Sequence, residues 1–598
     1  MPDLISARDL QFMLYEYLDT EALLARPRYA EHSREVFDAT MDTARQIAED
    51  VFAPHNARGD AHEPHFDGER VHHIPETKVG WDAFAHTGLL SAHWDEAEGG
   101  LQLPEVVLKA ALTWFNAANV ATTTYSWLTM GAANLLRSFG SDALKARYLT
   151  GMGDGRFAGT MAMTEPGQGS ALGDIQCAAQ PQADGSYRIT GNKMFVSGGD
   201  QSLSENIVHM VLARIKGAPA GVKGISLFLV PKFMVQPDGS LGARNDVALA
   251  GLLHKMGWRN TTSTVLAFGE KGGATGYLLG DEGKGLAHMF QMMNEARINI
   301  GMCAAAIAYR AYLLSLDYAR DRPQGRLPSC KDPLSPQVRL VAHADVRRML
   351  LAQKSYAEGA LAMCLYAASL FEDQHTHPDA SARGDAALLL DILTPVVKSW
   401  PSKYGCASND LAIQILGGSG YTREYLQEQL YRDQRLNPIH EGAEAIHGLD
   451  LLGRKVSMQG GAAYRVLRRA IDATLAQATQ DAALVGLTHF FTEPLRRLDQ
   501  VTPQLVALSA TDPDRALANA TLYLDATGRL VAAWVWLMQA IAAQRGLTGA
   551  DDASVPFYQG KLQAARYYIQ WELPATLAQF DLLARVDDIP LAMQDAWF

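Results

Sequence analysis

Two glycine-containing segments have the residue types that a large, flat or phosphorylated ligand requires. The first reads Met161-Ala-Met-Thr-Glu-Pro-Gly-Gln-Gly-Ser170, and the second reads Gly191-Asn-Lys-Met-Phe-Val-Ser-Gly-Gly199. Glycine has no Cβ, so Gly167 and Gly169 would let a ligand approach the backbone closely. The alternative is that both segments are only turns of a β domain. Hydroxyl groups suited to the polar edge of a ligand are those of Thr164, Ser170 and Ser197.

A further glycine cluster lies in Gln414-Ile-Leu-Gly-Gly-Ser-Gly-Tyr-Thr-Arg-Glu-Tyr425. It does not open a strand-turn-helix unit, which a dinucleotide-binding fingerprint requires. The cluster therefore either contacts a ligand in another way or ends a helix.

Glu441 is a candidate base within Asn437-Pro-Ile-His-Glu-Gly-Ala-Glu-Ala-Ile-His447. It follows residues 424–436, which the apolar pattern predicts to be one amphipathic helix. A carboxylate with restricted solvation has a raised pKa and can remove a weakly acidic proton. Taken by itself, however, a glutamate after a helix is more often a solvated surface group.

The elements that must position these residues change from helix to strand and back. Apolar residues recur at helical spacing from about 7 to 149, whereas short strand-like runs and turn residues alternate between about 161 and 268. Helical periodicity returns from about 283 to 457, with a proline-rich linker at 322–336, and continues over 459–598. The individual strands are predicted at 187–190, 193–197, 207–213, 225–230 and 264–268.

A chain of 598 residues is too long for one hydrophobic core. The pattern predicts a multidomain α+β fold in which a β domain lies within a helical protein. We expect a helical N-terminal domain over 1–158, a central β domain over 159–278, a helical bundle over 279–458 and an additional helical domain over 459–598.

Thr-Glu-Pro-Gly-x-Gly-Ser followed by Gly-x-Lys-x-Phe-Val-Ser resembles the flavin-binding signature of the acyl-CoA dehydrogenase family. Members of this family hold FAD between a helical, a β and a second helical domain, which is the order expected here. Gln414–Tyr421 resembles the family's Gln-x-x-Gly-Gly-x-Gly-Tyr motif, and Tyr318–Arg326 resembles another FAD-contacting turn without its usual aromatic residue. The resemblance covers about 35–455. It implies FAD contacts from Met161, Met163, Thr164, Gly169, Ser170, Phe195, Val196, Ser197, Arg322, Gln324, Gln414, Gly417, Gly418 and Gly442.

Ile439-His-Glu-Gly442 resembles the family's Ile-Tyr-Glu-Gly, whose glutamate is the base in most members. The resemblance implies that Glu441 removes the α-proton of an acyl-CoA while the β-hydride passes to FAD, giving a trans-2-enoyl thioester. The charge on the thioester oxygen would be met by a ribityl hydroxyl of FAD and the glutamate's own N–H. An electron-transfer flavoprotein is the implied electron acceptor. The implied acyl-CoA contacts are Ser170, Arg297 and Glu441.

The surroundings of Glu441 depart from the family pattern, because His440, Ala443 and Ala445 replace the usual tyrosine, threonine and glutamine. A minority of members place the base directly before an arginine in the helix that here includes 293–298, where this chain has Ala296. Glu295 is one residue away, which rotates it by about 100° around a helix. Glu441 is therefore the predicted base.

The segment 459–598 resembles the C-terminal extension of a larger bacterial subgroup of the family, with the clearest similarity at Phe557–Tyr568. We hypothesise that the extension covers the surface that forms tetramers in shorter relatives, so the expected state is a homodimer.

Composition limits the other functions that the chain could have. The net charge is −12, and residues 451–598 hold 13 lysines and arginines against 14 acids, which disfavours nucleic acid as a partner. The remaining alternatives are an acyl-CoA oxidase that reduces oxygen, a non-catalytic flavin- or DNA-binding relative and a helical scaffold that binds no flavin.

The five cysteines are scattered without a CxxC pair, so neither a disulfide framework nor a metal site is expected. The N-terminus lacks the pattern of an export signal, and the apolar stretch 530–543 is shorter than the roughly 20 residues that span a bilayer. No transmembrane segment is expected, and a cytoplasmic location is the default.

Overall fold

The computed structural model describes residues 3–598, apart from the side chains of residues 291–294. These residues form two compact units. The sheet unit contains residues 38–103 and 114–299, and the helical unit contains the residues up to 37 together with 104–113 and 300–598. Helices α5 (Glu105–Phe139) and α7 (Gly285–Asp321) contribute residues to both units.

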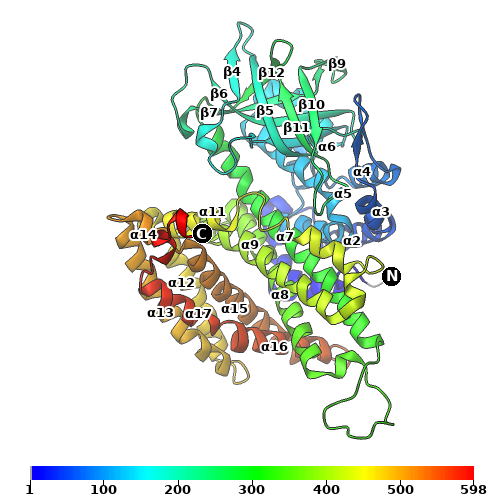
Figure 1. Ribbon diagram of the computed structural model, residues 1–598, viewed down its shortest axis with the longest axis vertical. Coiled ribbons are helices and arrows are strands. Elements are labelled where there is room, and N and C mark those ends of the chain that lie inside the picture. The colour runs from blue at the N-terminus through cyan, green and yellow to red at the C-terminus, as the bar shows by residue number, and fades with distance from the viewer. Residues whose placement is uncertain (1–2) are drawn as a thin grey trace. The chain divides into compact units, whose positions relative to one another are not determined.

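A mixed, eight-stranded sheet dominates the sheet unit (Figure 1). Its order is β10-β11-β5-β12-β7-β6-β3, and β4 pairs with both β5 and β6. Strands β3 and β4 run parallel to β6, whereas the other paired neighbours are antiparallel. The strands are β3 (Phe157–Ala162), β4 (Ala178–Pro181), β5 (Tyr187–Ser197), β6 (Asn206–Ile215), β7 (Ile225–Pro231), β10 (Val247–Leu252), β11 (Ser263–Phe268) and β12 (Ala274–Leu279).

Two hairpins and several helices complete the sheet unit. The hairpins pair β1 (His65–Phe66) with β2 (Val71–His72), and β8 (Phe233–Val235) with β9 (Leu241–Arg244). The helices are most of α2 (Arg34–Ile47), then α3 (Asn56–Ala61), α4 (Pro75–His86), the main part of α5, and α6 (Asp142–Gly153).

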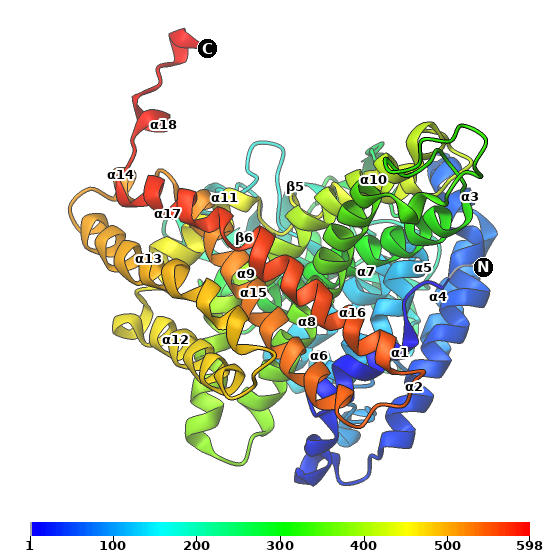
Figure 2. The same cartoon turned by 90° about the horizontal axis from the view of Figure 1, so that it is seen from below.

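The helical unit is built around the long helices α7, α8 (Ala344–Thr376) and α9 (Ala380–Leu416). Figure 2 shows the C-terminal helices running beside α8 and α9. The remaining helices are α1 (Ala7–Gln11), α10 (Gln427–Gln434), α11 (Glu444–Asp450), α12 (Met458–Thr479), α13 (Val485–Ser509), α14 (Pro513–Leu517), α15 (Ala520–Leu547), α16 (Val555–Tyr567), α17 (Ala575–Ala584) and α18 (Ile589–Ala592).

The C-terminal helices share the core of the helical unit. Trp536 of α15 is fully buried, and its indole N–H donates to the Ser355 carbonyl of α8 over 2.9 Å. Trp400 of α9 donates to the Tyr568 hydroxyl over 3.1 Å. Because a buried indole N–H needs an acceptor, these bonds fix how α15 packs on α8 and how the helical turn Tyr568–Glu572, directly after α16, packs on α9.

Helices α7 and α15 each contain an 18-residue window that is long and apolar enough to cross a membrane. The windows are 83% and 89% buried within the protein, so both helices serve as core helices.

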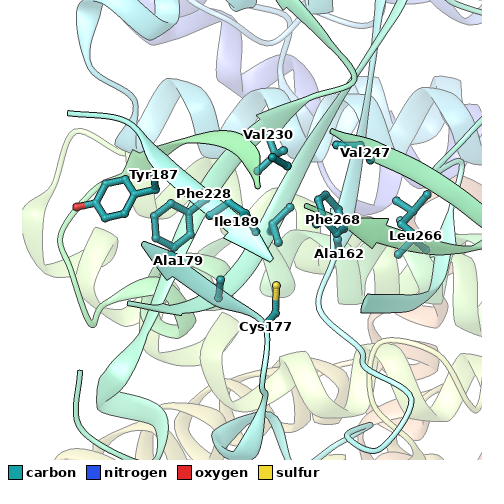
Figure 3. Close-up of a cluster of buried hydrophobic side chains, with 14 of the residues drawn as sticks. Ala162, Cys177, Ala179, Tyr187, Ile189, Phe228, Val230, Val247, Leu266 and Phe268 are labelled. Atoms are coloured by element: carbon teal, nitrogen blue, oxygen red, sulfur yellow. The ribbon is translucent and has the colours of Figure 1, made fainter. Parts of the chain in front are cut away.

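The strand pattern of the sequence is largely confirmed. Residues 187–190 and 193–197 form one continuous strand, β5, whose residues largely alternate between buried and less buried. Strands β6 and β7 are buried almost throughout, which explains their continuous apolar runs. Figure 3 shows the side chains that fill the core of this sheet, among them Ala162, Cys177, Ile189, Phe228, Val230, Leu266 and Phe268.

Candidate active site

The two segments predicted to contact flavin are joined by a buried ion pair within the sheet unit. Lys193 of β5 is fully buried, and its Nζ lies 2.9 Å from Glu165 Oε1 and donates to the Met163 carbonyl over 2.9 Å. The Glu165 carboxylate also accepts the backbone N–H groups of Gln176 at 2.6 Å and Cys177 at 2.9 Å. The N–H of Met194 donates to the Thr164 carbonyl over 2.9 Å. These bonds hold the loop after β3 against β5.

The exposed side of this arrangement leaves room for a ligand. A Cβ added to Gly167 or Gly169 would meet no atom within 4 Å. Gly169 and Ser170 are exposed, and Phe195 presents 62% of its surface from a left-handed backbone conformation with φ of 56°. Open glycines beside an exposed aromatic ring and a hydroxyl fit a flat, polar cofactor.

The other predicted residues of this region lie at different depths. Met161 and Val196 belong to the buried part of the sheet, while Met163, Thr164 and Ser197 are half-buried. Met161 and Val196 can therefore shape the predicted flavin site mainly through their backbone.

Helix α7 contributes the residues around the alternative base to the sheet unit. Ala296 and Arg297 are buried, and Arg297 is 3% exposed. Glu295 accepts a 2.9 Å hydrogen bond from the Asn134 side chain of α5. This bond gives the Glu295 carboxylate a structural partner on α5.

In the helical unit, the predicted cofactor residues of 322–324 and 414–418 lie near the ends of α7 and α9, whereas Gly442 lies beside Lys398 in the middle of α9. Helix α9 ends at Leu416, and Gly417 adopts φ of 60° as its C-cap. Tyr318 near the end of α7 donates to the Ser419 hydroxyl over 3.4 Å, and its ring lies 5.8 Å from that of Tyr425. The glycine cluster is thus both a helix stop and an exposed loop, because Cβ atoms at Gly417 and Gly418 would meet nothing within 4 Å.

Arg322 and Gln324 lie on the turn after α7. The Leu340 N–H donates to the Arg322 carbonyl over 2.9 Å, and the Gln324 N–H donates to the Val338 carbonyl over 2.8 Å. Both side chains are exposed, as is that of Gln414. Apolar residues of α7, α8 and α9 pack beneath, including Tyr312, Ala319, Met349, Ile415 and Leu416. These three polar side chains therefore project from the same end of the bundle.

Glu441 lies in the turn between α10 and α11. Its side chain is half-buried, and its φ of 52° places it in the left-handed region, as does the φ of 102° at Gly442. The helix before it covers only Gln427–Gln434, so the predicted helix over 424–436 is shorter than expected, and the chain turns from Arg435 onward.

Two side chains hold the backbone directly after Glu441. The Nζ of Lys398, a fully buried residue of α9, donates to the Gly442 carbonyl over 2.6 Å. Nε2 of buried His447 in α11 lies 3.0 Å from the same oxygen. A carbonyl can only accept, so this Nε2 carries the proton.

His440 precedes the base and is uncharged at neutral pH. Burial, assisted by the ammonium group of Lys398, lowers the pKa of His440 from 6.5 to about 3. The turn therefore presents one carboxylate beside a neutral imidazole.

A cavity of about 730 Å³ also lies in the helical unit, lined by residues of α8, α13, α16 and the turns beside them. Arg347, Arg348, Arg566 and Trp571 are among its lining residues. None of the predicted site residues lines it, so it is separate from the candidate site.

Sequence reasoning did not assign roles to Glu165, Lys193, Lys398 or His447. The Glu and Lys of the first two segments are visible in the motifs themselves, and their opposite charges could have suggested a pair. Lys398 is 44 residues from Gly442, and no local pattern connects them.

Comparison with known proteins decides the family. Family profiles match residues 35–156 (acyl-CoA dehydrogenase, N-terminal domain), 160–269 (middle domain), 283–457 (C-terminal domain) and 467–594 (acetyl-CoA dehydrogenase C-terminal like). The chain is 36% identical to 3-methylmercaptopropionyl-CoA dehydrogenase of Ruegeria pomeroyi, over 97% of this chain and 98% of that protein. The chain belongs to the acyl-CoA dehydrogenase family. It is an oxidoreductase of that family, with the additional C-terminal helical domain that the sequence predicts.

Other acyl-CoA dehydrogenases support the same assignment. A butyryl-CoA dehydrogenase of Syntrophomonas wolfei is 33% identical over 100% of this chain and 99% of its own length. The fold matches the crystal structure of an acyl-CoA dehydrogenase complexed with FAD from Bacillus anthracis, with a TM-score of 0.70, 21% identity, and coverage of 95% of this chain and 90% of that one. Members of the family bind FAD, and the open space at Gly167 and Gly169 is compatible with such a cofactor.

Proposed function

We propose that this acyl-CoA dehydrogenase family member binds FAD and converts a saturated acyl-CoA into the trans-2-enoyl-CoA, with Glu441 as the base. The observation that carries the proposal is the conformation of the Glu441 turn, which holds a half-buried carboxylate on a left-handed backbone. This turn lies within the segment 283–457 that matches the family's C-terminal domain.

The proposed chemistry begins at the α-carbon of the thioester. Its protons are weakly acidic, so the base must be a carboxylate of raised basicity. A carboxylate oxygen must also come within hydrogen-bonding reach of the α-carbon, about 2.6–3.2 Å. Partial burial of Glu441 restricts its hydration, which favours proton transfer from carbon. FAD, when bound, supplies the acceptor for the β-hydride.

The developing negative charge on the thioester oxygen requires a preorganised donor. The backbone N–H of Glu441 is the donor that this chain would supply, and its direction is set by the left-handed φ of the residue. The neutral imidazole of His440 adds no positive charge to the turn at neutral pH.

The cofactor contacts that we propose are the residues that the family resemblance implies. In the sheet unit they are Met161, Met163, Thr164, Gly169, Ser170, Phe195, Val196 and Ser197, and in the helical unit they are Arg322, Gln324, Gln414, Gly417, Gly418 and Gly442. Ser170, Arg297 and Glu441 are the proposed contacts of the acyl-CoA.

We also propose the domain boundaries given by the sequence pattern: 1–158, 159–278, 279–458 and 459–598. An electron-transfer flavoprotein is the proposed acceptor, the cytoplasm the proposed location, and a homodimer the proposed assembly.

A panel of acyl-CoA thioesters tests the function. Under anaerobic conditions, the purified protein loaded with FAD should lose its flavin absorbance on mixing with at least one straight-chain, branched or thioether acyl-CoA. Release of hydrogen peroxide during aerobic turnover at the rate of flavin reduction would identify an oxidase instead. A protein that cannot be loaded with FAD would contradict the proposal.

A further inference from the structure

The carbonyl of Gly442 receives hydrogen bonds from two helices at once. Lys398 reaches it from α9 over 2.6 Å, and His447 reaches it from α11 over 3.0 Å. We propose that Lys398 and His447 are positioning residues that hold the Glu441 turn in the conformation required for proton abstraction. This inference rests on the proposed role of Glu441 as the base.

The Lys398 bond is suited to fix a backbone group rigidly. Lys398 is fully buried and lies within the 37-residue helix α9, so its stem is enclosed by protein. A hydrogen bond from an ammonium group is charge-assisted and roughly twice as strong as a neutral one. An anchor in a packed helix therefore restrains the Glu441 turn from outside the turn itself.

The second bond defines the orientation of the same peptide. The Gly442 carbonyl oxygen has two lone pairs, and donors from α9 and α11 can occupy both. With both donors in place, the peptide plane between Gly442 and Ala443 cannot rotate without breaking one of them. The adjacent peptide, which includes the Glu441 backbone, is restrained in turn.

The backbone at Glu441 needs such restraint. A non-glycine residue in the left-handed region is strained, and such a conformation persists only where the surroundings impose it. The φ values of 52° at Glu441 and 102° at Gly442 place two successive residues there. Relaxation of either residue would redirect both the carboxylate and the N–H of Glu441.

Close packing at Gly442 shows that His447 acts together with Lys398 in holding the Gly442 carbonyl. A Cβ on Gly442 would lie 2.9 Å from His447 Nε2. The imidazole can therefore reach the carbonyl only because position 442 is glycine. Helix α11 is itself held by α15, since a Cβ on Gly448 would lie 2.7 Å from the Ala520 carbonyl carbon.

The experiment compares variants of the FAD-loaded protein by stopped-flow flavin reduction with a saturating acyl-CoA from the reactive panel. Lys398→Met keeps the length of the side chain and removes the donor. We expect its flavin-reduction rate to fall about 100-fold, as for a misplaced catalytic group, while the Kd for the thioester changes less than about threefold. Lys398→Arg should recover most of the rate, because it restores a charged donor.

A matched control removes another buried lysine that binds the same helix. Lys455 is 2% exposed, and its Nζ lies 2.7 Å from Asp391 of α9. Lys455→Met should reduce flavin within about twofold of the wild-type rate, because it does not touch the Glu441 turn. His447→Phe gives an independent test if Lys398→Met does not fold, and should also slow reduction without weakening thioester binding.

Wild-type reduction rates in Lys398→Met and His447→Phe, or slow rates that Lys398→Arg fails to improve, would overturn the positioning role. Glu441→Gln separates this outcome from failure of the proposed function. If Glu441→Gln reduces flavin normally, then Glu441 is not the base, whatever the Lys398 variants do.

Discussion

The glycines of the candidate site fall into two kinds at the residue scale. Gly442 is required by the protein itself, because its φ of 102° and the nearby His447 leave no place for a side chain. Gly169 and Gly418 face open space, and no contact among the described residues explains why they lack a side chain. The second kind is expected where a cofactor approaches the backbone.

Gly418→Ala tests this interpretation of the open glycines. Its methyl group meets no protein atom within 4 Å, so we expect the stability of the FAD-free protein to change by less than about 0.5 kcal/mol. The affinity for FAD should fall about tenfold or more, because the methyl group overfills the cofactor site. Gly384→Ala, also in open space but in α9 away from the glycine cluster, should leave the affinity for FAD unchanged, and it should raise stability by up to about 1 kcal/mol because alanine favours the helix. Titration calorimetry with FAD measures the difference, and unchanged affinity in Gly418→Ala would argue against this contact.

His440 predicts a specific dependence of stability on pH. Its pKa is about 3 when folded and near 6.5 when unfolded, so the unfolded chain binds the extra proton between these values. The contribution to stability is complete above pH 6.5 and is lost as the pH falls toward 3. His440→Asn should therefore lose stability less steeply than the wild type over this range in urea unfolding experiments. The exposed histidine variant His489→Asn should follow the wild-type slope. Parallel curves for His440→Asn and wild type would contradict this account.

At the scale of elements, residues of the flavin motifs have two roles: an inner role, which joins the segments to each other, and an outer role, which is contact with a ligand. Glu165 and Lys193 face inward and join the loop after β3 to β5, while Gly169, Ser170 and Phe195 remain on the exposed side. A resemblance of sequence identifies the motif as a whole. Only the three-dimensional contacts separate the residues that build it from those available to a ligand.

Lys193→Met tests the inner role. Removing one partner of a buried ion pair leaves an uncompensated carboxylate, which costs about 3–5 kcal/mol. We expect a loss of this size in the unfolding free energy, together with weaker FAD binding. Lys78→Met removes a lysine from an exposed pair with Asp82 and should cost no more than about 0.5 kcal/mol. A loss below 1 kcal/mol in Lys193→Met would show that the pair is not what joins the two segments.

The sequence predicted the elements better than their ends and contacts. Alternation and helical periodicity are local, so strands β6, β7 and β11 and the long helices could be found from them. Strands β3 and β12, which contain glycine and alanine, lack the pattern and were missed. Helix α10 stops at Gln434 because the following turns redirect the chain toward Glu441. Lys398 could not be connected to that turn, because their proximity results only from the packing of α9 and α11.

At the scale of the whole molecule, the C-terminal extension is part of the helical unit. Lys561 of α16 is fully buried between the carboxylates of Asp9 in α1 and Glu358 in α8. A buried network of this kind is stable only when every member is present. The extension therefore supports the first residues of the chain as well as α8 and α11.

Covering of the bundle by α12–α17 underlies the expectation of a homodimer. Sedimentation equilibrium of the FAD-loaded protein should give twice the mass of one chain across a tenfold range of concentration. A tetramer would show that the extension leaves the tetramer-forming surface free. A monomer would contradict the proposal that the protein forms a homodimer.

The central claim is that Glu441 removes the substrate proton. Its most direct test is anaerobic stopped-flow mixing of FAD-loaded Glu441→Gln with an acyl-CoA that bleaches the wild-type flavin. The substitution keeps the size of the side chain and removes the base, so we expect thioester binding within about threefold of wild type and flavin reduction slowed at least about 1000-fold. Flavin reduction by Glu441→Gln at the wild-type rate would contradict the account.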